Sequence, residues 1–410
     1  MTQLYYPLHS LREGNWFKLI CGASFQHLPA VRNLTLAYTL AGADCIDVAA
    51  DPAVIEVAQE ALQVAGTLTT AAQERGLNIP GKPWLMVSLN DGEDPHFRKA
   101  QFNPELCPPD CHRPCEKICP AQAIVFQNTS EVSSGVIDQR CYGCGRCIPI
   151  CPNQLIYTRS YVSSRSAIAQ LIMETGIDAL EIHTQVGHFT DFQLLWRVIA
   201  PWVYRLKLLA ISCPNGEGLI DYLRALYQLI APLPCALVWQ TDGRPMSGDI
   251  GIGTTRAAVK LSEKVLAAKL PGYVQLAGGT NHHTVAKLQA IGLLKGKERE
   301  EKERGGEGKN SSFPIPDSQP YVAGVAYGSY ARVLLLPILD ELEKLNEQEV
   351  AAHMAASPNL SFGHLEKFPT LLWQAVARAY SLVSQLKSSQ QLPEAIAFGG
   401  NKEGGIGNGE

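Results

Sequence analysis

The chain lacks the features that would direct it to a membrane or to nucleic acid. Residues 1–20 contain no apolar signal core, and no run of eighteen apolar residues occurs in the 410-residue sequence. The formal net charge is −4, and no basic stripe is present to neutralise phosphates. With 46% hydrophobic and 18% charged residues, the composition is typical of a soluble globular protein. We therefore expect a cytoplasmic protein with no transmembrane segment and no nucleic-acid partner.

Cysteine, by contrast, is abundant and concentrated in one stretch. Without an export signal, twelve cysteines indicate a reducing compartment, where thiols bind metals or carry out redox chemistry. Eight of them fall within the 45 residues from Cys107 to Cys151. The remaining four lie in predicted strands and are expected to be buried, inert thiols: Cys21, Cys45, Cys213 and Cys235.

The second cysteine run has the spacing of bacterial ferredoxins. Cys141, Cys144 and Cys147 are separated by two residues each, and Cys151-Pro152 follows after three more. In that pattern three thiolates bind one iron–sulfur cluster and the fourth binds the other cluster of a pair. Glycines between the first ligands permit the positive φ angles that a tightly curled loop needs. The run predicts iron–sulfur ligation.

The first run is less regular but shares its ending with the second. Its cysteines are spaced by three residues each: Cys107, Cys111, Cys115 and Cys119. CPAQAI after this run matches CPNQLI after the second, as expected of an internal duplication. By the exchange rule, Cys119 would join the second run and Cys151 would join the first. The competing interpretation is structural zinc, which usually takes CxxC pairs. We predict two 4Fe-4S clusters, of which the irregular first could lose one iron to become 3Fe-4S.

Outside the cysteine stretch, strands and helices alternate along the chain, which favours parallel strands with crossover helices. Eight strands are predicted: Phe17–Ser24, Asp44–Asp51, Pro83–Asn90, Asp178–Thr184, Arg205–Pro214, Cys235–Asp242, Tyr273–Gly279 and Tyr321–Gly328. Eight such units suggest an α/β fold of the (β/α)8 TIM-barrel type, which typically needs about 250 residues. The alternative is two doubly wound α/β sheets of four strands each.

The predicted domains follow from these patterns. The barrel would take residues 1–100 and 159–345, with a ferredoxin-like insert at 101–158. A charged, glycine-containing loop at 295–319 and a glycine-rich tail at 399–410 are expected to be disordered. Between them lies a helical extension at 346–398, in which Leu365–Leu386 has apolar residues at helical spacing. That helix would either pack on its own domain or bind a partner.

The carboxyl ends of barrel strands are where chemistry is expected. They carry Cys21, Asp51, Asn90, His183, Cys213, Gln240, Asp242, Asn281 and Ser329, among which no nucleophile–base pair is identifiable. Glu181 and His183 could share one side of a strand, although a structural histidine is the competing interpretation. The glycine-rich loop Arg244–Thr255 is either a ligand-wrapping loop or a long connection.

A phosphate site is predicted after the seventh and eighth strands, where this fold commonly binds phosphate. Gly278 and Gly279 precede one helix, and Gly328 and Ser329 precede another, with Arg332 in the first turn. Backbone N–H groups there could hold a phosphate-bearing ligand such as flavin mononucleotide. The competing interpretation is that these glycines only form tight turns.

Four stretches of the sequence resemble a known family. LREGNWFKLICGASFQHLP, CHRPCEKICPAQAI, CYGCGRCIPICP and GRPMSGDIGIGTT are similar to the cyanobacterial light-dependent period A proteins, iron–sulfur proteins of circadian clock input. The resemblance implies that Cys141, Cys144, Cys147 and Cys151 are cluster ligands. It also implies redox sensing and clock partners, namely the Kai proteins and an input histidine kinase, and it raises electron-transport components or quinones as further partners.

Three functions are compatible with this sequence. The first is a redox-sensing signalling protein that is not an enzyme, in which a change of cluster charge changes a partner interface. The second is an oxidoreductase that passes electrons from the clusters to a cofactor or substrate on the barrel. The third is a plain electron carrier, which would not need a barrel of this size. A tightly bound organic cofactor would favour the second, and redox-dependent partner binding without turnover would favour the first.

Overall fold

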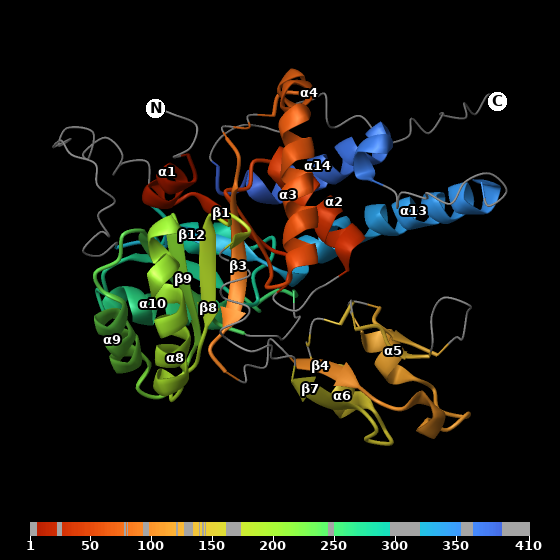
Figure 1. The fold of residues 1–410 in the computed structure, drawn as a ribbon, viewed down its shortest axis with the longest axis horizontal. Helices are drawn as coiled ribbons and strands as arrows, with labels where there is room; N and C mark the ends of the chain where they lie inside the picture. Colours follow the sequence, from red (N-terminus) through yellow and green to blue (C-terminus); the bar gives the residue numbers. More distant parts are fainter. Residues whose placement is uncertain are drawn as a thin grey trace, which may run out of the picture.

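Eight parallel strands form a closed barrel (Figure 1). The computed structural model describes residues 6–22, 27–77, 79, 81–92, 98–119, 122–126, 134–138, 140, 141, 143, 145–160, 174–244, 250–295, 320–353 and 364–387. In barrel order the strands are β1 (Trp16–Ile20), β2 (Cys45–Ala49), β3 (Trp84–Asn90), β8 (Ala179–His183), β9 (Leu208–Pro214), β10 (Ala236–Asp242), β11 (Tyr273–Ala277) and β12 (Gly324–Tyr327). The ring closes where β1 pairs with β12, with Phe17 opposite Val325. The barrel prediction is confirmed, and the alternative of two open sheets is wrong.

Helices surround the barrel and bury apolar residues against it. They are α2 (Leu28–Leu40), α3 (Pro52–Thr67), α4 (Thr69–Glu74), α8 (Phe189–Ile199), α9 (Leu219–Ile230), α10 (Arg256–Ala267), α11 (Thr284–Ala290) and α13 (Ser329–His353), with a 3-10 turn at Ala200–Arg205. In α9, for example, Leu219, Leu223 and Leu226 recur at helical spacing and are all buried. Asp51 caps α3 by accepting a hydrogen bond from the Ala53 N–H at 2.9 Å.

One predicted helix is divided in the structure. The sequence pattern predicts a single helix over Ala53–Arg75, but α3 ends at Thr67 and α4 begins at Thr69. Thr67 Oγ1 donates to the Val64 carbonyl at 2.7 Å, and Thr69 Oγ1 donates to the Ala65 carbonyl at 3.2 Å. Such bonds from threonine to the preceding turn bend helices, which accounts for the break.

The two ends of the chain pack onto the barrel. The short helix α1 (Tyr6–Glu13) closes the amino-terminal end, where Leu8 and Leu11 join Trp16 and Trp84 in one core cluster. After a 3-10 turn at Leu365–Lys367, helix α14 (Pro369–Val383) packs against α2 and α13. The predicted apolar stripe of α14 is buried there, so this helix packs on its own chain. Beyond it, Lys387 Nζ donates to Asp44 Oδ2 at 2.5 Å.

Some predicted segments fall on residues that the structure does not describe. The charged loop at 295–319 lies outside the described residues except for Lys295, and the tail at 399–410 lies outside them entirely. Among the described helices, none is both long enough and apolar enough to cross a membrane.

Candidate functional site

The cysteine segment leaves the barrel at the carboxyl end of β3 and returns before β8. Its base is a two-stranded antiparallel sheet, in which β4 (Arg98–Gln101) pairs with β7 (Tyr157–Ser160) and Ala100 lies opposite Thr158. A second small sheet pairs β5 (Ile124–Val125) with β6 (Gly135–Val136), and a 3-10 turn spans Pro104–Leu106. Figure 1 shows this segment as a lobe beside the barrel. Any cluster here therefore lies on the side of the barrel where β-strand carboxyl ends meet.

The internal duplication seen in the sequence has a structural counterpart. Short helices precede both CP endings, α5 (Pro114–Ile118) before Cys119 and α6 (Cys147–Ile150) before Cys151. Three residues after each of those cysteines, Gln122 and Gln154 adopt positive φ angles of 48° and 51°. Each glutamine N–H donates back to the preceding cysteine carbonyl, at 3.2 Å and 3.1 Å. Left-handed backbone is uncommon for glutamine, so its recurrence at equivalent positions marks two copies of one loop.

One group of thiols contains most of the first run together with Cys151. Burial and a hydrogen bond with Cys111 raise the pKa of Cys107, and the Cys151 thiol is close enough to raise it further. Burial likewise raises the pKa of Cys115, to which Cys151 and Cys107 both contribute electrostatically. The effect of the Cys151 thiol on the pKa of both Cys107 and Cys115 indicates that Cys151 lies near these two residues of the first run. The crossed ligand pattern stays a prediction.

The other group contains Cys119 and Cys141. Burial raises the pKa of Cys141, and the nearby Cys119 thiol raises it further. The Ala100 N–H donates to Cys141 Sγ at 3.4 Å, and the Ala123 N–H donates to Cys119 Sγ at 3.2 Å. Cys147 is buried in the same small core. Cys144 lies outside the described residues.

The donor set fits iron–sulfur chemistry. Thiolates are the usual ligands of such clusters, and backbone N–H groups that donate to their sulfurs are among the protein features that set cluster potentials. Five of the thiols lie in or against a compact apolar core that includes Phe102 and Ile156: Cys115, Cys119, Cys141, Cys147 and Cys151. Within the described part of the chain, no three Cys, His, Asp or Glu residues converge as ligands of a single metal ion. The eight-cysteine ligand assignment itself stays a prediction.

Charged side chains connect the cysteine segment to the barrel helices. Arg140 lies 3.8 Å from Glu343 of α13, and His27, just before α2, lies 3.9 Å from the same carboxylate. Burial, with the positive charge of Arg140, lowers the pKa of His27 to about 4. His27 is therefore neutral at physiological pH, and Arg140 supplies the positive charge at this junction.

The interior of the barrel holds a buried lysine. Lys18 of β1 has 0% of its side chain exposed, and its Nζ lies 2.9 Å from Asp47 Oδ2 on β2. Lys18 also forms an ion pair with Glu181 on β8 and donates to Gln240 Oε1 on β10 at 2.9 Å. Burial alone would lower the pKa of Lys18, but the two carboxylates raise it above its ordinary value. Lys18 is thus a cation held between two buried carboxylates.

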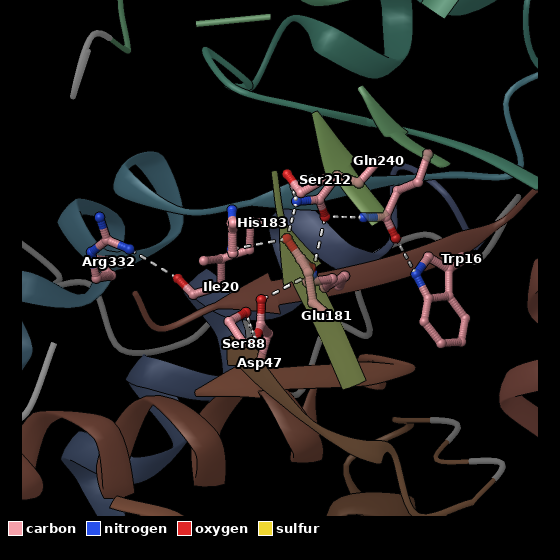
Figure 2. A network of polar contacts seen from close by, with 11 residues as sticks. Trp16, Ile20, Asp47, Ser88, Glu181, His183, Ser212, Gln240 and Arg332 are labelled. Atoms are coloured by element: carbon pink, nitrogen blue, oxygen red, sulfur yellow. Dashed lines mark hydrogen bonds and ion pairs between the residues drawn. The ribbon is translucent and has the colours of Figure 1, made fainter. Parts of the chain in front are cut away.

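Hydrogen bonds extend this ion pair across the barrel (Figure 2). Gln240 Nε2 donates to Glu181 Oε1 at 2.5 Å and to Ser212 Oγ at 3.1 Å. Ser88 Oγ donates to Asp47 Oδ1 at 2.7 Å, and His183 Nε2 lies 3.1 Å from Glu181 Oε1. We call the connected set the barrel network: Trp16, Lys18, Asp47, Ser88, Glu181, His183, Ser212, Gln240 and Gln275. Glu181 and His183 do share one side of β8, as predicted.

Lys18, at the centre of this network, is not among the site residues predicted from the sequence. Lys18 lies in a strand predicted simply as buried, and its partners are on strands far away in sequence. The available signal was a lysine inside the apolar stretch WFKLI, since a lysine is almost never fully buried unless paired. Of the strand-end residues proposed from the sequence, Gln240 and His183 belong to the network, whereas Asp51 caps α3.

The residues predicted to hold a phosphate lie at the carboxyl ends of neighbouring strands β11 and β12. Gly278 and Gly279 have φ angles of +73° and +81°, and a Cβ at Gly278 would lie 2.0 Å from Asp242 Oδ1. The Gly279 carbonyl accepts from Thr254 Oγ1 at 2.8 Å. These contacts make the turn closely packed.

Gly328 and Ser329 lead into the first turn of α13. Arg332 donates to the Ile20 carbonyl at 2.9 Å, as drawn in Figure 2, and to Ser329 Oγ at 3.2 Å. The guanidinium thereby joins the end of β1 to the start of α13. The phosphate-bearing ligand stays a prediction.

Together, the fold and the cysteine segment define an α/β-barrel protein that carries an iron–sulfur segment. Residues 107–162 match the model described as the LdpA Fe-S cluster-binding domain, and residues 171–385 match the Light dependent period A C-terminal domain. The chain is 47% identical over 384 residues to "Light dependent period A" of Synechococcus elongatus, covering 94% of each chain. The chain belongs to the light dependent period A family, which confirms the resemblance and an iron–sulfur cofactor.

A solved structure of tryptophan synthase from Mycobacterium tuberculosis is also similar over 94% of this chain and 97% of that one. Its sequence identity is 12% and the TM-score is 0.36. A likeness at that level adds nothing to the barrel assignment, which rests on the strand pairing described above.

Proposed function

We propose that this protein is a cytoplasmic redox sensor that conveys the light-dependent redox state of the cell to the circadian clock. Membership of the light dependent period A family, with its iron–sulfur-binding segment, is the observation that carries the proposal. Its partners would be clock components, namely the Kai proteins and an input histidine kinase. Electron-transport components or quinones would supply the redox signal.

Two 4Fe-4S clusters with crossed ligands are part of the proposal. Cys119, Cys141, Cys144 and Cys147 would hold one, and Cys107, Cys111, Cys115 and Cys151 the other. The proximity of Cys151 to Cys107 and Cys115, and of Cys119 to Cys141, supports this division. Cys107, Cys111 and Cys151 are partly exposed, whereas Cys119 is the only partly exposed thiol among the described ligands of the other cluster. The first-run cluster would therefore be the one that loses iron to become 3Fe-4S.

When bound, a cluster supplies a reversible one-electron change of charge. The chain's own contribution is to connect that charge to a surface. Arg140 lies one residue before Cys141 and 3.8 Å from Glu343 of α13. A change of charge at Cys141 would alter the attraction between Arg140 and Glu343, and with it the seating of the cysteine segment against α13. A partner that binds across this junction would sense the difference.

A strain carrying Cys144→Ser and Cys147→Ser should keep a folded barrel but lose the dependence of clock period on light intensity. Two of the four proposed ligands of one cluster are removed, while the barrel core is untouched. Period would be measured from a bioluminescence rhythm at several light intensities, with Cys213→Ala, a buried cysteine of β9, as the matched control. A Cys144→Ser, Cys147→Ser strain that still adjusts its period normally would contradict the sensor proposal.

The alternative function is an oxidoreductase that passes electrons from the clusters to a ligand on the barrel. The polar barrel network, which includes Glu181 and His183, is the observation that favours it. Gly278, Gly279, Gly328 and Ser329 would hold the phosphate of a flavin mononucleotide or similar ligand.

Anaerobically purified full-length protein should, in this alternative, release a phosphate-bearing small molecule on denaturation. The release would be measured by mass spectrometry, and affinity for flavin mononucleotide by calorimetry. If neither detects a phosphate compound, the turns at Gly278 and Gly328 are structural and the sensor stands without a barrel ligand.

A further inference from the structure

One helical face on the outside of the barrel carries exposed apolar and aromatic side chains. Helix α8 lies beside α9 (Figure 1) and runs directly into the 3-10 turn at Ala200–Arg205. Its inner side, which includes Phe192 and Leu195, is buried in the core. The outer side carries residues spaced three or four apart, which therefore lie in one row along the helix. We call this row, with the adjoining Trp202, the α8 face: Leu194, Arg197, Pro201, Trp202, Tyr204 and Arg205.

The apolar part of the α8 face is open to solvent. Leu194 is 43% exposed and Tyr204 is 66% exposed. A single exposed apolar side chain is ordinary on a protein surface. Here the two share a face with Trp202, which packs against the core on one side and stays partly exposed on the other. Exposed tryptophan, tyrosine and arginine side chains that lie together are typical of the centre of a protein–protein contact.

Arg205 holds the two aromatic side chains of this face in place. Its guanidinium carbon lies 4.7 Å from the centre of the Trp202 ring and 5.7 Å from the centre of the Tyr204 ring. Its Nε also donates a hydrogen bond to Tyr204 Oη at 3.2 Å. Side chains that are already ordered lose less conformational entropy when a partner binds. The stacked group would therefore be ordered at little further cost in a complex.

The charge of the α8 face is positive and uncompensated. Arg197 and Arg205 are both exposed, and neither forms an ion pair with a carboxylate in the part of the chain that the structure describes. On the neighbouring helix α9, Asp221 lies 3.1 Å from Arg224 and so has its own counter-ion. The acidic residue of α8 itself, Asp191, is in the first turn, six residues before Arg197. A binding partner would have to supply the negative charge.

This positive charge distinguishes the possible occupants of the face. A second copy of the chain on the same face would place arginines against arginines, which is unfavourable. Anionic membranes and nucleic acids attract proteins through many basic side chains. This face has two, and the whole chain has a formal net charge of −4. A protein segment with carboxylates around an apolar side chain fits both properties of the face.

We propose that the α8 face is the docking site for an acidic segment of a partner protein. Carboxylates of the partner pair with Arg197 and Arg205, and an apolar side chain of the partner lies against Leu194 and Tyr204. One helix face is small for an interface, so the complex is weak and transient. The inference rests on the proposed function in one respect, because the partner is taken to be one of the clock components proposed there.

Replacing Tyr204 by alanine should weaken binding of the partner roughly tenfold or more, because this side chain belongs to the ordered apolar centre. Full-length protein, reconstituted anaerobically, would be titrated by calorimetry with each purified Kai protein and with the input histidine kinase. The double variant Arg197→Glu, Arg205→Glu should also weaken binding and remove most of its dependence on salt. Tyr157→Ala and Lys260→Glu make the same kinds of change at exposed positions elsewhere and should leave the affinity unchanged.

The outcomes separate this inference from the proposed function. If no clock component binds the wild-type protein, the proposed partners and this inference are both wrong. Binding that Tyr204→Ala and the double arginine variant leave unchanged would overturn this inference alone, as would wild-type binding that does not weaken with salt. A wild-type dimer, or binding to phosphatidylglycerol vesicles, that Tyr204→Ala abolishes would assign the face to a different occupant and overturn it too. Circular dichroism would check folding; if Tyr204→Ala is not folded, Leu194→Asp places a charge in the same apolar centre, and the same criteria apply to it.

Discussion

Cys119→Ser should destroy the cluster whose other ligands come from the second cysteine run, and spare the cluster of its own run. Iron bound per chain is expected to fall by roughly half, since one of two clusters loses a thiolate. The reason is spatial. The Cys119 thiol raises the pKa of Cys141, 22 residues later in the chain, while Cys115 responds to Cys151 and Cys107. EPR spectra of the reduced protein, together with iron analysis, would identify which signal disappears.

Cys151→Ser is the matched partner of this experiment. It occupies the equivalent place in the second copy of the loop, after α6 and before a left-handed glutamine. It should remove the signal that Cys119→Ser retains. If each serine instead removes the cluster of its own run, so that Cys119→Ser and Cys115→Ser give the same spectrum, the ligands are not crossed.

The barrel could be predicted because each of its strands has a recognisable local sequence pattern. FKLIC and PWLMVSLN are short, mostly apolar runs, and each continues into small or polar residues where the strand ends. The helix beginning at Pro52 was also predictable, from a capping Asp51 before a proline at the first helical position. The break at Leu68 could not be predicted from the local pattern. It depends on hydrogen bonds from threonine side chains to carbonyls of the preceding turn.

The iron–sulfur segment could also be predicted from the sequence, for a different reason. Cluster ligands must be cysteines at fixed spacings, so the sequence carries the chemistry directly. Ala100 gave no such signal. It lies seven residues before the first cysteine, and its N–H donates to Cys141 Sγ at 3.4 Å, a contact that the spacing of the cysteines does not indicate. A role that depends on long-range pairing is invisible in spacing.

The barrel network could be predicted from the sequence only in part. The period of two along β8 correctly placed Glu181 and His183 on one side. Lys18, the counter-ion of Glu181, is 163 residues away in sequence and contacts Glu181 only because the barrel is closed. A charged residue in a buried strand indicates that an oppositely charged partner exists, but only the topology of the barrel identifies that partner.

Lys18→Met should be among the most destabilising single changes in the barrel, costing about 3–5 kcal/mol of unfolding free energy. The substitution keeps the length of the side chain and removes the cation. Asp47 and Glu181, 2% and 0% exposed, would then remain as buried carboxylates facing each other without their counter-ion. Chemical denaturation followed by circular dichroism would measure the loss. Lys207→Met, which breaks the partly exposed pair with Asp178, is the control and should cost less than about 1 kcal/mol.

The pH dependence of Lys18→Met provides a sharper test than its stability at one pH. In the wild-type protein burial already raises the pKa of Asp47, Lys18 opposes this, and Glu181 adds to it. Removing Lys18 raises the folded-state pKa of Asp47 further above its unfolded value. A carboxyl with a raised folded pKa favours the folded state below its unfolded pKa and loses that advantage as pH rises through the folded pKa. The stability gap between Lys18→Met and wild type should therefore narrow from pH 8 to pH 5.

Neutralising the carboxylates should recover much of the lost stability. In the triple variant Lys18→Met, Asp47→Asn, Glu181→Gln no buried charge is left unpaired among these three positions, and replacing a whole buried ion pair is often close to neutral. The narrowing of the gap at low pH should disappear as well, because the groups that titrate are gone. A triple variant as unstable as Lys18→Met, with the same gap at pH 5 and pH 8, would mean that Lys18 acts by packing and not by its charge.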